Sequence, residues 1–139
     1  MKAIVRINPR TYDSFFAPVA KQYPGLIDKL IRDFKRYVDS DRNYQPSYFG
    51  RDCPYVEPPL AYSSRLMHLH LNLSPSGFPH SKPRNDRTSD TALVYVRGEL
   101  DDYQYSLLAV FHPDAHHLAR DSKMMNYLAR IAKDFREEY

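Results

Sequence analysis

The stretch from Tyr103 to Phe111 constrains the fold most, because apolar residues occupy both of its alternating faces. A strand of this kind has to lie at the centre of a sheet. The stretch from Ala92 to Arg97 is similarly rich in Val, Leu and Tyr, and the polar residues 98–102 separate the two stretches. Together they predict an antiparallel hairpin whose second strand is central.

Two further segments have the pattern of strands. Residues 3–7 are short and β-branched, and Asn8-Pro9 ends them. Residues 66–73 alternate almost perfectly, which predicts a strand with one apolar face. Its apolar face would carry Met67, Leu69, Leu71 and Leu73, and its polar face His68, His70 and Asn72.

Three segments have helical periodicity. Apolar residues from Tyr12 to Val19 recur at helical spacing with an interruption at Pro18, and a clear 3.6-residue stripe runs from about Gly25 to Ser40. A closing helix should begin after Asp121 or Ser122 as N-cap. The order of strand, two helices, three strands and a helix predicts an α+β fold, with helices covering an antiparallel or mixed sheet. We expect a single domain over residues 1–139.

Two segments lack a regular period. Residues 41–64 contain four prolines and predict a long loop. In this loop Tyr44, Tyr48, Tyr55 and Tyr62 lie near Arg42 and Arg51, which suits either base stacking or packing against the core. Residues 74–90 are rich in Pro, Ser and basic side chains and predict an exposed, positively charged loop.

Composition limits the class of protein. The 20 Lys and Arg residues against 17 Asp and Glu give a net charge of +3, which permits an RNA partner without demonstrating one. Cys53 is the only cysteine, so no intrachain disulfide can form, and its neighbours suggest an inert thiol. No apolar segment reaches the length of a signal peptide or a membrane span, so we expect a cytoplasmic protein without membrane contact.

The histidine pair of the predicted strand 66–73 is the first candidate for chemistry. His68 and His70 should project from one face about 6.5 to 7 Å apart. Two imidazoles there could remove a proton from a ribose 2′-hydroxyl, or could bind a metal with a third ligand from His112, His116 or His117. They could also be structural or solvent-facing residues.

A second candidate set consists of Arg87, Asp90 and Arg120. Cleavage of a phosphodiester builds negative charge on the non-bridging oxygens, and a guanidinium can meet this charge with two parallel hydrogen bonds. Each Arg, taken singly, could equally be a surface or salt-bridged residue.

Five short motifs, in order and in register, carry a resemblance to a known family. They are Phe49-Gly50-Arg51-Asp52, His68-Leu69-His70-Leu71, Arg87-Thr88-Ser89-Asp90, Leu93-Val94-Tyr95 and His116-His117-Leu118-Ala119-Arg120-Asp121. Together they resemble the YafO toxin family from Phe49 to Tyr139. The expected order of helices and strands also resembles the compact RelE-like toxin fold. The family resemblance implies a type II toxin with a protein antitoxin. It also implies association with the ribosome, where we expect contact with the large subunit, and cleavage of translated messenger RNA without a metal or other cofactor.

The resemblance also selects candidate site residues. His112 and His117 fall outside the matched motif positions, whereas seven others fall on them: His68, His70, Arg87, Asp90, His116, Arg120 and Asp121. We expect His70 or His68 to act as base and His116 as acid, with Arg87 and Arg120 stabilising charge and Asp90 and Asp121 orienting these groups. Arg51, Lys82 and Arg84 are expected to contact messenger or ribosomal RNA phosphates, or an acidic antitoxin. The alternatives are a non-catalytic ribosome-binding inhibitor and a His-metal hydrolase.

Overall fold

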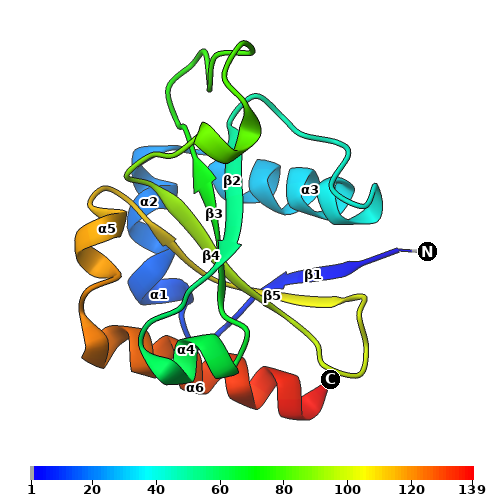
Figure 1. Ribbon diagram of the computed structural model, residues 1–139, viewed down its shortest axis with the longest axis vertical. Helices are drawn as coiled ribbons and strands as arrows, with labels where there is room; N and C mark the ends of the chain where they lie inside the picture. The colour runs from blue at the N-terminus through cyan, green and yellow to red at the C-terminus, as the bar shows by residue number, and fades with distance from the viewer. Residues whose placement is uncertain (1) are drawn as a thin grey trace.

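The computed structural model describes residues 2–139 and contains one five-stranded mixed sheet in the order β1-β5-β4-β3-β2 (Figure 1). Strands β2 to β5 pair antiparallel in succession, and β1 lies parallel to β5 at one edge. The strands are β1 (Ile4–Ile7), β2 (Phe49–Pro54), β3 (Met67–Leu71), β4 (Ala92–Arg97) and β5 (Gln104–Phe111). The predicted hairpin is confirmed as β4 and β5, and β5 lies inside the sheet as its two apolar faces require.

The three segments predicted to be helical are helical, and two short helices in residues 59–63 and 115–118 were not predicted. The helices are α1 (Tyr12–Phe15), α2 (Ala17–Gln22), α3 (Leu26–Asp39), α4 (Pro59–Ser63), α5 (Ala115–Leu118) and α6 (Ser122–Glu138), with one 3₁₀ turn, η1 (Arg84–Asp86). The interruption predicted near Pro18 is the break between α1 and α2. The predicted N-cap of α6 is Asp121, whose carboxylate accepts a 3.0 Å hydrogen bond from the backbone N–H of Met124. Among residues 2–139 no helix combines the length and the apolar character that crossing a membrane would need.

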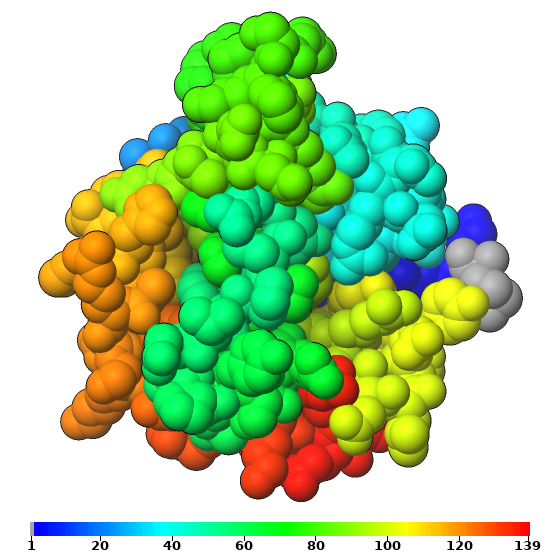
Figure 2. Space-filling model, in the orientation of Figure 1, coloured from blue at the N-terminus to red at the C-terminus, as the bar shows by residue number. Residues whose placement is uncertain are grey.

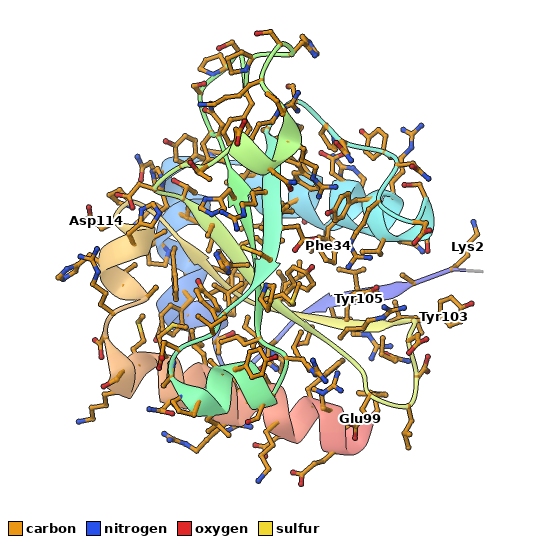
Figure 3. All side chains as sticks on the ribbon, viewed as in Figure 1. Lys2, Phe34, Glu99, Tyr103, Tyr105 and Asp114 are labelled. Carbon is orange, nitrogen blue, oxygen red and sulfur yellow. The ribbon has the colours of Figure 1, made fainter. Side chains whose placement is uncertain are left out.

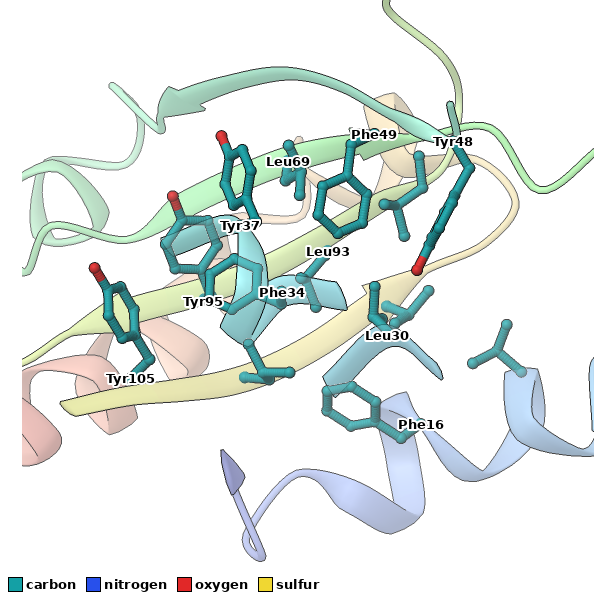
Figure 4. Close-up of a cluster of buried hydrophobic side chains, with 14 of the residues drawn as sticks. Phe16, Leu30, Phe34, Tyr37, Tyr48, Phe49, Leu69, Leu93, Tyr95 and Tyr105 are labelled. Carbon is teal, nitrogen blue, oxygen red and sulfur yellow. The ribbon is translucent and has the colours of Figure 1, made fainter. Parts of the chain in front are cut away.

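The sheet has a hydrophobic core on each face. On one face, which we call the α3 face, Leu30 and Phe34 pack against Leu69, Leu93 and Tyr95 (Figure 4). On the opposite face, α6 packs over β4 and β5. This second core includes Val94, Leu108, Phe111, Met125, Leu128 and Ala132. The two cores explain why β5 carries apolar residues on both sides.

The prediction that residues 41–64 lack regular structure is wrong, since the segment contains β2 and α4. Pro54 is compatible with β2 because it ends an edge strand, where a missing N–H breaks no ladder hydrogen bond. Pro59 occupies the first turn of α4, a position that also needs no intrahelical N–H partner. The sheet therefore has five strands where the sequence pattern indicated four.

Residues 74–90 are irregular apart from η1, as predicted, and project from the end of the sheet as a knob (Figures 1 and 2). The segment is nevertheless well anchored. Phe78 is buried, and its N–H donates a 2.8 Å hydrogen bond to the carbonyl of Ser47. Gly50 lets the segment approach β2, because a Cβ there would clash with the Arg87 carbonyl and the Phe78 ring.

Candidate active site

The candidate site lies on the outer part of the sheet, on the face that α6 covers only in part. We call this the histidine face. In the β3–β4 register His68 pairs with Val94 and His70 with Ala92, while the intervening Leu69 points to the α3 face. Because α6 packs on β4 and β5, the imidazoles on β3 lie beyond its main contacts.

Three of the predicted histidines form a row. The ring centroids of His68 and His70 are 5.3 Å apart, and those of His70 and His116 are 6.0 Å apart. His116 is contributed by α5, which follows the end of β5. The fold thus brings together side chains that lie almost 50 residues apart in the sequence.

His68 is half-buried and lies against Tyr55 and Cys53. Its ring stacks on Tyr55 with centroids 4.1 Å apart, and its Nε2 lies 3.4 Å from the Cys53 sulfur. Its Nδ1 is buried without a hydrogen-bond partner within residues 2–139. Burial, assisted by the neighbouring His70, lowers the pKa of His68 to about 4. His68 is therefore neutral near pH 7, with both nitrogens directed at the protein.

His70 is buried, with a residue exposure of only 6%. Unlike His68, it has backbone partners for its Nδ1. Its Nδ1 lies 3.0 Å from both the backbone nitrogen and the carbonyl oxygen of Ser89. Burial lowers the pKa of His70, and the Ser89 carbonyl acts in the opposite direction. In the tautomer that donates Nδ1–H to this carbonyl, Nε2 carries the lone pair that a general base needs.

Asp90 orients the exposed His116. Its Oδ1 lies 3.1 Å from His116 Nδ1 and accepts a 3.1 Å hydrogen bond from the backbone N–H of His116. Its Oδ2 accepts a 2.9 Å bond from the N–H of Asp114, which Figure 3 labels at the start of α5. The His116 N–H is the largest cause of a lowered pKa of Asp90. An ionised Asp90 can hold His116 with its Nε2 free to donate a proton.

Three other predicted site residues lie apart from the histidine row, and two of them have structural contacts elsewhere. The guanidinium of Arg87 donates hydrogen bonds of 2.8 and 3.4 Å to the carbonyls of Lys82 and His80, inside the knob. Asp121 caps α6. Arg120 is exposed after α5, and its guanidinium forms no hydrogen bond or ion pair within the described part of the chain. None of the three forms a hydrogen bond or ion pair with His68, His70 or His116 among residues 2–139.

The three residues predicted to contact RNA also differ in their exposure and contacts. Arg51 and Lys82 are exposed, but Arg84 is half-buried and hydrogen-bonded to the protein. Its Nε donates a 3.1 Å hydrogen bond to the Gly50 carbonyl, and its Nη2 bonds to the Tyr37 hydroxyl. Arg84 therefore links the knob to β2 and α3.

Sequence reasoning missed the neighbours that β2 and the residue after it contribute to the site. Cys53 pairs with His68 across the β2–β3 ladder, and Tyr55 stacks on the same ring. The alternation of Arg51, Cys53 and Tyr55 would have matched that of the two histidines if residues 49–54 had been recognised as a strand. Pro54 and Gly50 obscured that signal.

The other histidines of the 112–117 segment do not join the row. His112 Nδ1 lies 2.7 Å from the Thr91 hydroxyl, and its ring packs edge-on against Tyr23. His117 is exposed on α5. Within residues 2–139 no three His, Cys, Asp or Glu side chains are placed to hold a metal ion together.

Comparison with known proteins identifies the family. Residues 35–137 match the family model of toxin YafO of type II toxin-antitoxin systems. The chain is 34% identical over 117 residues to the mRNA interferase toxin YafO of Escherichia coli (strain K12), covering 81% of this chain and 87% of that protein. No solved structure matches. The family match spans the positions of all five motifs noted above, and the chain belongs to the YafO family of toxins of type II toxin-antitoxin systems.

Proposed function

We propose that this toxin is a metal-independent endoribonuclease that cuts translated messenger RNA on the ribosome in the cytoplasm. The observation that carries the proposal is the pair of His70 and His116, whose rings lie 6.0 Å apart. Each imidazole has Nδ1 engaged by a protein group, which leaves Nε2 for substrate. The name of the Escherichia coli relative, an mRNA interferase toxin, supports the same activity.

His70 acts as the general base in this proposal. Its Nε2 takes the proton from a ribose 2′-hydroxyl, and the resulting oxygen attacks the adjacent phosphorus. Burial favours this role, because a lowered pKa keeps His70 unprotonated at neutral pH. His68 is the weaker candidate, since its Nε2 faces the Cys53 sulfur and its Nδ1 is buried. Its ring instead packs against the rings of both Tyr55 and His70 and would help to hold His70 in position.

His116 acts as the general acid. It donates the Nε2 proton to the 5′-oxygen as the bond from phosphorus to that oxygen breaks. The products are a 2′,3′-cyclic phosphate and a 5′-hydroxyl end. Asp90 holds the His116 ring in place, because its carboxylate lies 3.1 Å from Nδ1. The exposed position of His116 gives a leaving strand access to the ring.

The remaining predicted residues have supporting roles. Arg87 shapes the knob through the carbonyls of His80 and Lys82, and Lys82 is exposed to contact RNA phosphates. Arg120 is exposed shortly after His116 in the sequence, and in this proposal it neutralises charge on the substrate. Partners in this proposal are the messenger RNA, the ribosome with its large subunit, and a cognate protein antitoxin. A RelE-like relationship of the fold rests on the order of helices and strands alone.

The proposal is tested by cleavage of a reporter messenger RNA in a reconstituted translation reaction. His70→Ala and His116→Ala should each lower the cleavage rate about 100- to 10,000-fold, the range of general acid-base catalysis. His117→Ala is the matched control, because His117 is the neighbouring exposed histidine of α5. Cleaved wild-type product should carry a 2′,3′-cyclic phosphate.

Three results would contradict the proposal, each in a different way. Cleavage at the wild-type rate by both His70→Ala and His116→Ala would exclude this site. Loss of activity in EDTA, restored by a divalent metal in a reaction with ribosome-free RNA, would favour the His-metal hydrolase. Arrested translation with intact messenger RNA would favour a non-catalytic ribosome binder.

A further inference from the structure

An irregularity in β2 determines which of its side chains reach the histidine face. Phe49 pairs with Leu71 and Asp52 pairs with Leu69, with a register shift between the two pairs. Two β2 residues, Gly50 and Arg51, therefore lie opposite a single β3 residue, His70. This is the arrangement of a β-bulge, which commonly redirects a side chain beside a functional site.

The direction of Arg51 follows from its neighbour. The Asp52 side chain points to the α3 face, where it accepts 2.7 Å hydrogen bonds from the hydroxyls of Tyr37 and Tyr95. Because successive side chains of a strand alternate, Arg51 points to the opposite face. Cys53, the next residue but one from Arg51, contacts His68 on that same histidine face.

The backbone around Arg51 is held from the knob as well as from β3. The N–H of Arg51 donates a 2.9 Å hydrogen bond to the Arg87 carbonyl. Gly50 makes room for that carbonyl, and its own carbonyl accepts the hydrogen bond from Arg84 Nε. The position of Arg51 is thus set by the bulge and by the docked knob, while its side chain stays exposed.

The charge of Arg51 acts on the histidine row. Burial is the main cause of the lowered pKa values of His68 and His70, and the Arg51 charge adds a smaller contribution in the same direction. Within residues 2–139 its guanidinium has no hydrogen bond or ion pair to a protein group, in contrast to that of Arg87. All five N–H donors of Arg51 are therefore available to a ligand on the histidine face.

We infer that Arg51 is a catalytic residue, whose guanidinium binds the non-bridging oxygens of the scissile phosphate beside His70. This inference rests on the proposed function and extends it by assigning the group that stabilises the transition state. Attack of the 2′-oxygen places additional negative charge on those oxygens. A guanidinium can meet the charge with two parallel N–H···O hydrogen bonds, which strengthen as the charge develops.

The experiment compares Arg51→Ala, Arg51→Lys and Arg130→Ala in the reconstituted translation reaction with a reporter messenger RNA. Arg130 is a matched control, since it is exposed on α6 and removes the same charge away from the site. At saturating toxin, Arg51→Ala should lower the cleavage rate about 100-fold or more. Arg51→Lys should recover part of that loss, because an ammonium supplies charge without the bidentate geometry.

A second measurement needs no RNA. Removal of the Arg51 charge should raise the pKa of His70 in an NMR titration of the imidazole signals, whereas Arg130→Ala should leave it unchanged. An unchanged His70 pKa in Arg51→Ala would show that Arg51 does not act beside His70. The same titration reports whether each variant retains the folded environment of His70.

The results separate this inference from the proposed function. If His70→Ala is inactive but Arg51→Ala cleaves like Arg130→Ala, the proposed function stands and the role of Arg51 is wrong. If Arg51→Ala raises only the half-saturating toxin concentration, Arg51 is a binding residue and the catalytic assignment is also wrong. If His70→Ala retains full activity, the proposed site fails whatever Arg51 does.

Discussion

The two faces of the β2–β3 ladder differ in whether their buried polar groups have hydrogen-bond partners. On the α3 face, the Asp52 side chain is only 6% exposed, and it accepts hydrogen bonds from Tyr37, Tyr95 and Arg42. On the histidine face, the Tyr55 hydroxyl and His68 Nδ1 are buried without partners within residues 2–139. A fully satisfied network favours one rigid arrangement, whereas unsatisfied polar groups reduce stability and are common where a protein has chemistry to perform.

The Phe49-Gly50-Arg51-Asp52 motif joins these two faces. Phe49 packs in the core of the α3 face, and Asp52 accepts hydrogen bonds from the hydroxyls of Tyr37 and Tyr95. Between them, Gly50 admits the knob and Arg51 turns to the histidine face. One short motif thus combines packing, a close backbone approach and a candidate ligand for phosphate.

The largest effect on stability is expected from Asp52→Ala. The change leaves two tyrosine hydroxyls and Arg42 without their shared acceptor. Each hydrogen bond to a charged group contributes about 1.5 to 3 kcal/mol, so the two tyrosine bonds together should account for a loss of about 3 to 5 kcal/mol. Urea denaturation at pH 7 measures the free energy of unfolding. Asp102→Ala is the control, because its ion pair with Arg97 is exposed and should contribute little. A loss for Asp52→Ala no larger than that of the control would show that the network does not stabilise the fold.

These two faces also show what a sequence can predict. The strand containing His68 and His70, the hairpin of β4 and β5, and helices α3 and α6 were predicted correctly, because periodicity is a local property of the chain. Strand β2 was missed because it is a bulged edge strand that contains Gly50 and ends at Pro54. Its pairing depends on contacts with Leu71, Leu69 and Arg87, which only the folded chain brings together.

The candidate site was predictable to a similar extent. Motif positions led to His68, His70, His116 and Asp90, which the fold does bring together. The same motifs contain residues whose contacts are structural, such as Arg87 in the knob and Asp121 at the start of α6. A motif does not distinguish these uses, because the hydrogen-bond partner of a long side chain is set by tertiary structure.

The second-largest expected effect is a pH dependence of the free energy of unfolding that arises from His68. Its pKa is about 4 in the folded chain and about 6.5 when unfolded, so between these values the unfolded chain binds more protons. The free energy of unfolding should therefore fall as pH decreases from 7 to 4, by up to about 3 kcal/mol. Urea denaturation at pH 7 and pH 4.5 measures this loss.

His68→Gln should make stability less dependent on pH, while the exposed control His117→Gln should keep the wild-type dependence. An identical pH dependence in wild type and His68→Gln would mean that burial of His68 does not depress its pKa. The lowered pKa of His70 leaves some residual dependence in the variant.

The smallest expected effect on stability comes from removing the hydroxyl of one tyrosine on each face. Tyr95→Phe removes a hydroxyl that donates a 2.7 Å hydrogen bond to Asp52, and a bond to a charged group contributes about 1.5 to 3 kcal/mol. Tyr55→Phe removes a buried hydroxyl without a protein partner and preserves the ring that stacks on His68. It should leave stability unchanged or raise it by about 1 kcal/mol. Equal losses in the two variants, measured by urea denaturation, would show that a group such as an ordered water satisfies Tyr55, and the histidine face would then be as fully hydrogen-bonded as the α3 face.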